Sequence, residues 1–71
     1  MTPETFYAEL TDIFEEPVTA GTEFKALPAW SSVTSLSVIL AIEELSGFRL
    51  TPTDLLESAT AGELYSRVSA R

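Results

Sequence analysis

Hydroxyl side chains gather near the middle of the chain, and they are the residues best placed to take part in chemistry. They are Ser31, Ser32, Thr34, Ser35 and Ser37. They stand at or near the start of the most apolar stretch, where serine would be an ordinary helix N-cap. A helix N-terminus also favours an anion, because free backbone N–H groups and the positive end of the helix dipole point at it. A serine esterified to a phosphate would gain from both effects.

The residue types that are missing narrow the possible chemistry further. The 71 residues include no histidine, cysteine, asparagine or glutamine. The chain therefore has no thiolate nucleophile, imidazole base, disulfide or Cys/His zinc site of its own. The acidic pairs Glu15-Glu16 and Glu43-Glu44 are adjacent, and neighbours on a helix point about 100° apart, so neither pair can act on one bond. No calcium-loop spacing or glycine-rich phosphate loop is present either, and we expect the acids to form solvated faces.

The charge balance limits the partners. Eleven acidic residues against four basic residues give a net charge of −7, which disfavours binding to nucleic acid and to anionic membranes. An apolar content of 45% predicts a folded chain. The longest apolar run, from Val38 to Ile42, is far too short to span a bilayer, and Glu4 stands where a signal peptide carries a basic residue. We expect a soluble cytoplasmic protein without membrane insertion.

The first half of the chain predicts one helix followed by a long loop. Thr2-Pro3 pairs a capping residue with a proline at the first helical position. An apolar stripe at helical spacing follows, formed by Phe6, Leu10, Ile13 and Phe14. Pro17 is expected to end this helix. From Val18 to Trp30 there is no sustained period, which predicts a loop anchored to the core by Phe24, Leu27 and Trp30.

The second half predicts three more helices. The first runs from about 32 to 46, with Gly47 as its C-terminal residue and an apolar stripe of Val33, Leu36, Ile39, Leu40 and Ile42. Thr51-Pro52 with Asp54 opens a short helix, and a capping box from Thr60 to Glu63 opens the last one, with Arg67 and Arg71 near its negative end. The expected fold is an all-α, small four-helix bundle of three longer helices and one short helix. It has a long first loop and forms a single domain over residues 1–71.

Three segments carry a family resemblance. They are Trp30-Ser31-Ser32-Val33, Ala41-Ile42-Glu43-Glu44 and Thr60-Ala61-Gly62-Glu63, and together they resemble the acyl carrier protein family. In that family a serine in an Asp-Ser-Leu motif opens the second helix and is esterified by 4′-phosphopantetheine. An Ala-Leu-Glu-Glu-like segment closes that helix, and a Thr-Val start opens the last one. When Ser32 is aligned with the modified serine, both later segments fall in register without a gap, so the resemblance spans almost the whole chain.

The resemblance implies a non-catalytic carrier that holds acyl intermediates as thioesters on a 4′-phosphopantetheine arm derived from coenzyme A. It places the attachment point at Ser32, with Ser31 and Val33 beside it, and it implies no metal site. The implied partners are a phosphopantetheinyl transferase and acyl-processing enzymes with basic docking patches, in fatty-acid, polyketide or related biosynthesis. The carrier is expected to be a monomer. Because the thiol belongs to the arm, such a protein has no need of its own cysteine.

Two departures from the family pattern accompany the resemblance. Ser31 stands where the family has Asp, a residue associated with the transferase and its metal. Thr34, Ser35 and Ser37 occupy positions where acids often face basic partners. Ser35 is the rival attachment point because Ser35-Leu36 imitates the Ser-Leu of the motif. It lies 43 − 35 = 8 residues before Glu43, whereas Ser32 lies 43 − 32 = 11 before it, and it falls beyond the first helical turn.

The sequence is also compatible with two other function classes. A small unmodified helical adaptor could bind a partner helix through an apolar groove, and it would account equally well for the size and acidity of the chain. A carboxylate-dependent hydrolase would need two acids that converge from different helices in a cleft.

Overall fold

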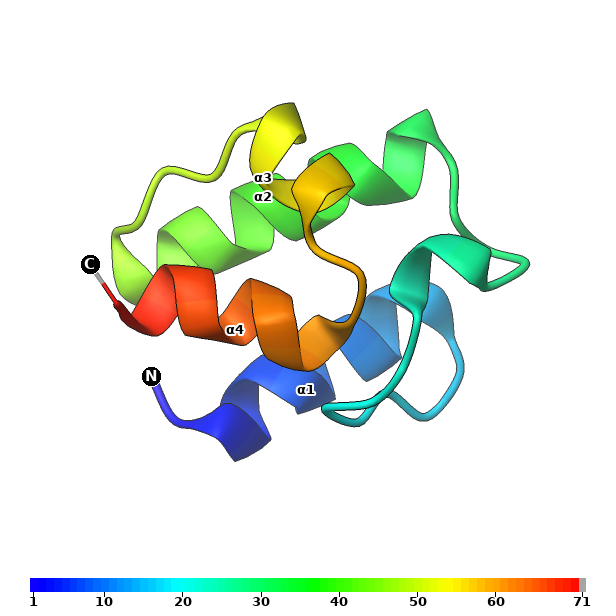
Figure 1. The fold of residues 1–71 in the computed structure, drawn as a ribbon, viewed down its shortest axis with the longest axis horizontal. Helices are drawn as coiled ribbons and strands as arrows, with labels where there is room; N and C mark the ends of the chain where they lie inside the picture. The colour runs from blue at the N-terminus through cyan, green and yellow to red at the C-terminus, as the bar shows by residue number, and fades with distance from the viewer. Residues whose placement is uncertain (71) are drawn as a thin grey trace.

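The computed structural model describes residues 1–70, in which four α-helices are joined by loops and no strand occurs (Figure 1). The helices are α1 (Pro3–Phe14), α2 (Ser32–Ser46), α3 (Pro52–Glu57) and α4 (Ala61–Ser69), and a short 3-10 turn, η1 (Phe24–Ala26), interrupts the first loop. α1 packs against α2 and α4, and α3 contacts both α2 and α4. The predicted all-α class, the long first loop and the short third helix are confirmed.

Each α-helix begins at a hydroxyl residue whose side chain accepts a hydrogen bond from the backbone N–H three positions later. These N-caps are Thr2, Ser31, Thr51 and Thr60. The bond satisfies one of the N–H groups that a helix start leaves free, so it defines where the helix begins. At α4 the expected capping box is incomplete. The carboxylate of Glu63 accepts from the N–H of Ala59 at 3.3 Å, one residue before the position that the motif predicts.

The helix ends depend on residues in the left-handed region. Gly47 ends α2 with φ 75°, as predicted. The prediction that Pro17 ends the first helix is wrong, because α1 stops at Phe14 and Glu15 adopts φ 58°. The N–H of Glu15 donates to the carbonyl of Thr11 at 2.8 Å. A left-handed residue turns the chain out of the helix axis before the proline is reached.

The core receives side chains from all four helices and from the first loop. Its buried residues are Phe6, Leu10, Phe14, Val18, Phe24, Val38, Ile42, Leu50, Leu55, Ala61, Leu64 and Val68. The apolar stripe predicted for α1 is confirmed as its core face, although Ile13 is only half-buried. Leu27 and Trp30 pack against the same cluster, so the first loop is anchored as the sequence predicts.

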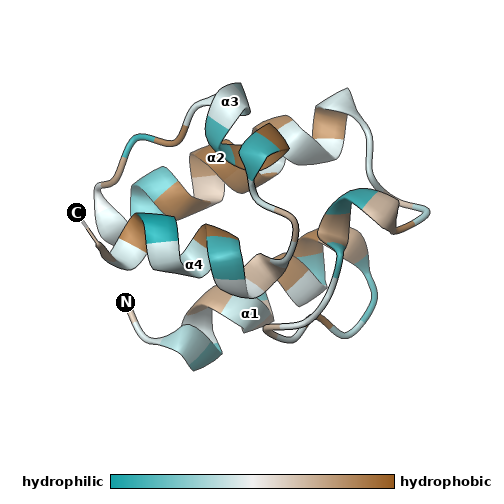
Figure 2. Ribbon diagram, viewed as in Figure 1, coloured by the Kyte–Doolittle hydropathy of each residue, from teal (hydrophilic) through white to brown (hydrophobic). Residues whose placement is uncertain are grey.

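The apolar stripe predicted for α2 faces the core only in part, through Ile39 and Ile42. Val38 and Ile42 are buried, but Val33, Leu36 and Leu40 have exposed fractions of 72%, 56% and 55%. Figure 2 shows apolar residues along much of this helix rather than along one stripe. Because α2 is apolar on most sides, its spacing alone does not identify the side that the other helices cover. We call the exposed side chains of Val33, Leu36 and Leu40 the α2 outer face.

The first loop closes over the start of α4. The N–H of Ala61 donates to the carbonyl of Thr22 at 2.9 Å, and the N–H of Gly62 donates to the carbonyl of Ala20 at 2.8 Å. Amides in the first helical turn have no partner within their own helix, so the loop supplies the acceptors that α4 lacks. A Cβ at Gly62 would lie 2.9 Å from the Ala20 oxygen, so this approach requires glycine.

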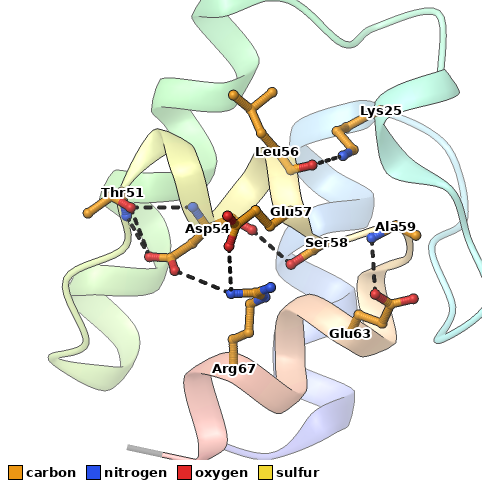
Figure 3. Close-up of polar contacts among 9 residues, drawn as sticks. All are labelled: Lys25, Thr51, Asp54, Leu56, Glu57, Ser58, Ala59, Glu63 and Arg67. Atoms are coloured by element: carbon orange, nitrogen blue, oxygen red, sulfur yellow. Dashed lines mark hydrogen bonds and ion pairs between the residues drawn. The ribbon is translucent and has the colours of Figure 1, made fainter.

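Two basic side chains hold α3 in place (Figure 3). Arg67 of α4 lies 3.5 Å from a carboxylate oxygen of Glu57 and 3.8 Å from one of Asp54. Lys25 of η1 donates to the carbonyl of Leu56. Arg67 is in the last turn of α4, as predicted, and its guanidinium reaches across to α3; the prediction for Arg71 lies outside the described residues.

Candidate functional site

Ser31 is the residue that caps α2. Its backbone is extended, with φ −160°, and its hydroxyl oxygen accepts from the N–H of Thr34 at 3.2 Å. In return the N–H of Ser31 donates to the hydroxyl of Thr34 at 2.8 Å, which completes a capping box. Ser32 is therefore the first residue inside the helix and takes no part in the cap.

Ser32 presents a free hydroxyl. The residue is exposed, and its side-chain oxygen has no hydrogen-bond partner among residues 1–70. The intrahelical bonds of α2 begin with the N–H of Ser35, which donates to the carbonyl of Ser31 at 2.9 Å. The N–H groups of Ser32 and Val33 thus lie at the positive end of a 15-residue helix without an intrahelical acceptor. A negative charge attached to Ser32 is favoured at this place.

The other hydroxyls of the cluster are occupied. Ser35 donates to the carbonyl of Ser32 at 2.9 Å, and Ser37 donates to the carbonyl of Val33 at 3.1 Å. Thr34 donates to the carbonyl of Ala29 at 2.8 Å, which ties the end of the first loop to the helix. The capping role of Thr34 is not among the features predicted from the sequence. Its position three residues after the N-cap is the signal from which its capping role could have been found.

Trp30 fixes the chain immediately before the site. Its ring centroid lies 5.6 Å from that of Phe24 in an edge-on arrangement and 6.1 Å from that of Phe14. Phe14 and Phe24 are both in the buried core. Trp30 is a loop anchor, as expected, and it connects the start of α2 to the aromatic part of the core.

The surface beside Ser32 is apolar rather than acidic. The α2 outer face begins at Val33, next to Ser32, and the first turn of the helix carries no acid. The acids of α2 are Glu43 and Glu44 near its far end, where Glu43 pairs with Arg49 at 3.4 Å. The acids of α2 therefore lie about three turns from Ser32.

The carboxylates show no catalytic arrangement. None of the eleven acidic residues is buried, and no three of them within residues 1–70 gather closely enough to hold a metal ion. The same part of the chain encloses no pocket. The hydrolase hypothesis needs its two acids in a cleft, and residues 1–70 form no such cleft. No helix in this part combines the length and apolar character needed to cross a bilayer.

Comparisons of the chain with protein-family models, with curated proteins and with solved structures find no match. The function of the α2 N-terminus is therefore inferred from its own residues and geometry.

Proposed function

We propose that this chain is a carrier of the acyl carrier protein type, with a 4′-phosphopantetheine arm attached to Ser32. The observation that carries the proposal is the exposed, unpaired hydroxyl of Ser32 at the N-terminus of α2, among neighbours whose hydroxyls are all engaged. The four helices, the long first loop and the short α3 agree with the layout that the family resemblance implies.

The residues of this site fit the proposed group. Attachment would form a phosphodiester between Ser32 Oγ and the phosphate of the arm as the pyrophosphate bond of coenzyme A breaks, so that its nucleotide part leaves and the hydroxyl proton passes to the transferase. The ester retains a negative charge, which the helix dipole and the free N–H groups of Ser32 and Val33 stabilise. When bound, the arm supplies the thiol on which an acyl group is carried as a thioester. The domain contributes recognition and a high effective concentration of the acyl group.

Ser31 affects how readily this arm is added. Serine and aspartate are both good N-caps, so Ser31 keeps the capping role that an aspartate would also perform. It offers no carboxylate to a metal held by the transferase. We therefore expect a transferase adapted to serine at this position, and faster modification of a Ser31→Asp variant by a transferase of broad specificity.

The surface next to Ser32 defines the partners that we propose. A transferase or acyl-processing enzyme that reaches Ser32 also meets the α2 outer face, so its docking surface needs apolar side chains there. A basic group at one side of that surface would face Glu44, which is exposed at the far end of α2. The net charge of −7 steers such basic partners toward the domain and repels nucleic acid.

A second candidate function is an unmodified helical adaptor. The α2 outer face favours it, because exposed apolar side chains at helical spacing are also what a partner helix would bind. An adaptor leaves Ser32 without a role. The protein isolated from its own host would then carry no added mass, whereas a carrier would show the mass of the arm.

Intact mass spectrometry tests the carrier proposal directly. The purified chain is incubated with coenzyme A and a broad-specificity phosphopantetheinyl transferase. We expect the wild type and the matched control Ser35→Ala to gain the mass of one phosphopantetheine group, and Ser32→Ala to gain none. The proposal fails if the wild type gains no mass or if Ser32→Ala gains as much as the wild type.

A further inference from the structure

The hydroxyl of Thr34 joins the first loop to α2 immediately around Ser32. It donates to the carbonyl of Ala29 at 2.8 Å and accepts from the N–H of Ser31 at 2.8 Å. Neither of these two backbone groups has another hydrogen-bond partner among residues 1–70. A single oxygen atom therefore satisfies both of these backbone groups of the segment that leads into the helix.

The same segment is also fixed by Trp30. The indole packs on Phe14 and Phe24, so the residue between Ala29 and Ser31 is held by the core. Thr34 supplies the second attachment, from the helix. With both in place, the path of the backbone into Ser32 is defined by contacts to the core and to the helix within one short segment.

We propose that Thr34 is a positioning residue for the modification of Ser32. Its hydroxyl holds the segment from Ala29 to Ser31 in one geometry, so that Ser32 is presented to the transferase already in place. This inference rests on the proposed carrier function. A site that is held in its binding geometry loses less conformational entropy when a partner binds. A site that samples several geometries has an apparent affinity that is multiplied by the fraction of time it spends in the competent one.

A variant without the Thr34 hydroxyl tests the link between the first loop and α2 while the helix can still form. In Thr34→Val the backbone N–H of residue 34 remains, so Ser31 Oγ still has its capping donor and the start of α2 is kept. The contacts that disappear are the short ones to the Ala29 carbonyl and the Ser31 N–H, both 2.8 Å, and the longer ones to the carbonyl and hydroxyl of Ser31, at 3.2 and 3.4 Å. The variant thus releases the loop from the helix and removes the reciprocal half of the capping box, while the bond from the residue-34 N–H to Ser31 Oγ and the Trp30 anchor are kept.

The experiment compares three variants in steady-state phosphopantetheinylation with coenzyme A and one transferase. Thr34→Val is expected to raise the KM for the carrier severalfold, up to about fivefold for loss of the hydrogen bond to the Ala29 carbonyl, with kcat changed less than about twofold. Thr34→Ser keeps the hydroxyl and is expected to restore the wild-type KM. Ser35→Ala is the matched control, because it removes a hydroxyl from the same turn that does not touch the loop.

Amide hydrogen exchange at Ser31 supplies a readout that does not depend on the transferase. We expect the Ser31 amide to exchange faster in Thr34→Val than in the wild type, and at the wild-type rate in Thr34→Ser. Thermal unfolding verifies that each variant is folded, and Thr34→Ala replaces Thr34→Val if the latter does not fold.

The outcomes separate this inference from the carrier proposal. A wild type that gains no mass contradicts the carrier proposal itself. A wild-type KM in Thr34→Val despite faster exchange at Ser31 overturns the positioning role, because the released loop would not matter for modification. A raised KM with unchanged exchange at Ser31 also overturns it, since Thr34 would then contact the transferase directly.

Discussion

Ser31→Ala should lower the stability of the fold but leave modification possible, whereas Ser32→Ala should keep the stability and abolish modification. The two residues are neighbours of the same type, so the comparison isolates their positions. Ser31→Ala removes the oxygen that accepts from the N–H of Thr34 at 3.2 Å. Loss of a serine N-cap costs about 1 kcal/mol of folding free energy. Ser32→Ala removes an exposed hydroxyl that has no partner among residues 1–70, and alanine has the higher helix propensity by about 0.5 kcal/mol. In a domain of this size about 1 kcal/mol corresponds to a change in Tm of about 4–8 °C.

Thermal unfolding followed by circular dichroism measures the stability effect, and urea denaturation verifies that the unfolding slope is unchanged. We expect Tm to fall by about 4–8 °C in Ser31→Ala and to stay within about 3 °C of the wild type in Ser32→Ala. Modification should follow the reverse pattern, with a mass gain in Ser31→Ala and none in Ser32→Ala. Equal losses of Tm in the two variants would refute the assignment of Ser31 as the cap. A mass gain in Ser32→Ala but none in Ser31→Ala would move the attachment point to Ser31.

Three further predictions follow from the fold and from the α2 outer face. Gly62→Ala should lower Tm by at least about 4 °C, because the new Cβ would lie 2.9 Å from the Ala20 oxygen and must displace the loop. Glu15→Gly should stabilise the protein to urea by about 0.5–1 kcal/mol, because it relieves the left-handed φ of 58° at the end of α1. Leu40→Ser should change Tm by less than about 4 °C yet raise the KM of the transferase severalfold, because Leu40 is 55% exposed on the α2 outer face.

Each of these predictions has a matched control. Gly21→Ala should leave Tm unchanged or slightly raised, because no atom lies within 4 Å of the added Cβ. Glu15→Ala keeps the left-handed strain and should not stabilise α1. Leu56→Ser removes an exposed leucine of α3 outside the α2 outer face and should leave the KM of the transferase unchanged. Equal KM values for Leu40→Ser and the wild type would exclude the α2 outer face from docking.

The helix starts could be predicted from the sequence because a cap is a local interaction. The caps at Thr2, Ser31, Thr51 and Thr60 each involve a hydroxyl and an N–H three residues later, so neighbouring residues decide the outcome. The left-handed end at Gly47 is local for the same reason. The resulting number and order of helices agree with the sequence-based expectation.

The features that could not be predicted depend on distant segments. The buried side of α2 is set by where α1 and α3 lie, and a helix that is apolar on most sides carries no signal for that choice. Glu15 ends α1 in a left-handed conformation that is usually adopted by glycine, so its residue type does not mark it as a helix end. Proline, which disfavours helix, predicts an end at Pro17 instead. The link from Thr34 to Ala29 needs the folded loop. The spacing from Ser32 to the two later segments predicts Ser32 as the attachment point. That its hydroxyl is unpaired depends on the partners that the neighbouring hydroxyls find in the folded chain.

The backbone bonds from α4 to the first loop bear on how the chain folds and opens. The acceptors on Ala20 and Thr22 lie about forty residues before their donors on Gly62 and Ala61, so this contact forms only when most of the chain has collapsed. The loop that leads to Ser32 and the last helix should therefore belong to one cooperative unit, and the amides of Ala61 and Gly62 should exchange with the same opening free energy. The rate at which a protease cleaves the first loop would then measure how often α4, about forty residues later in the sequence, separates from it.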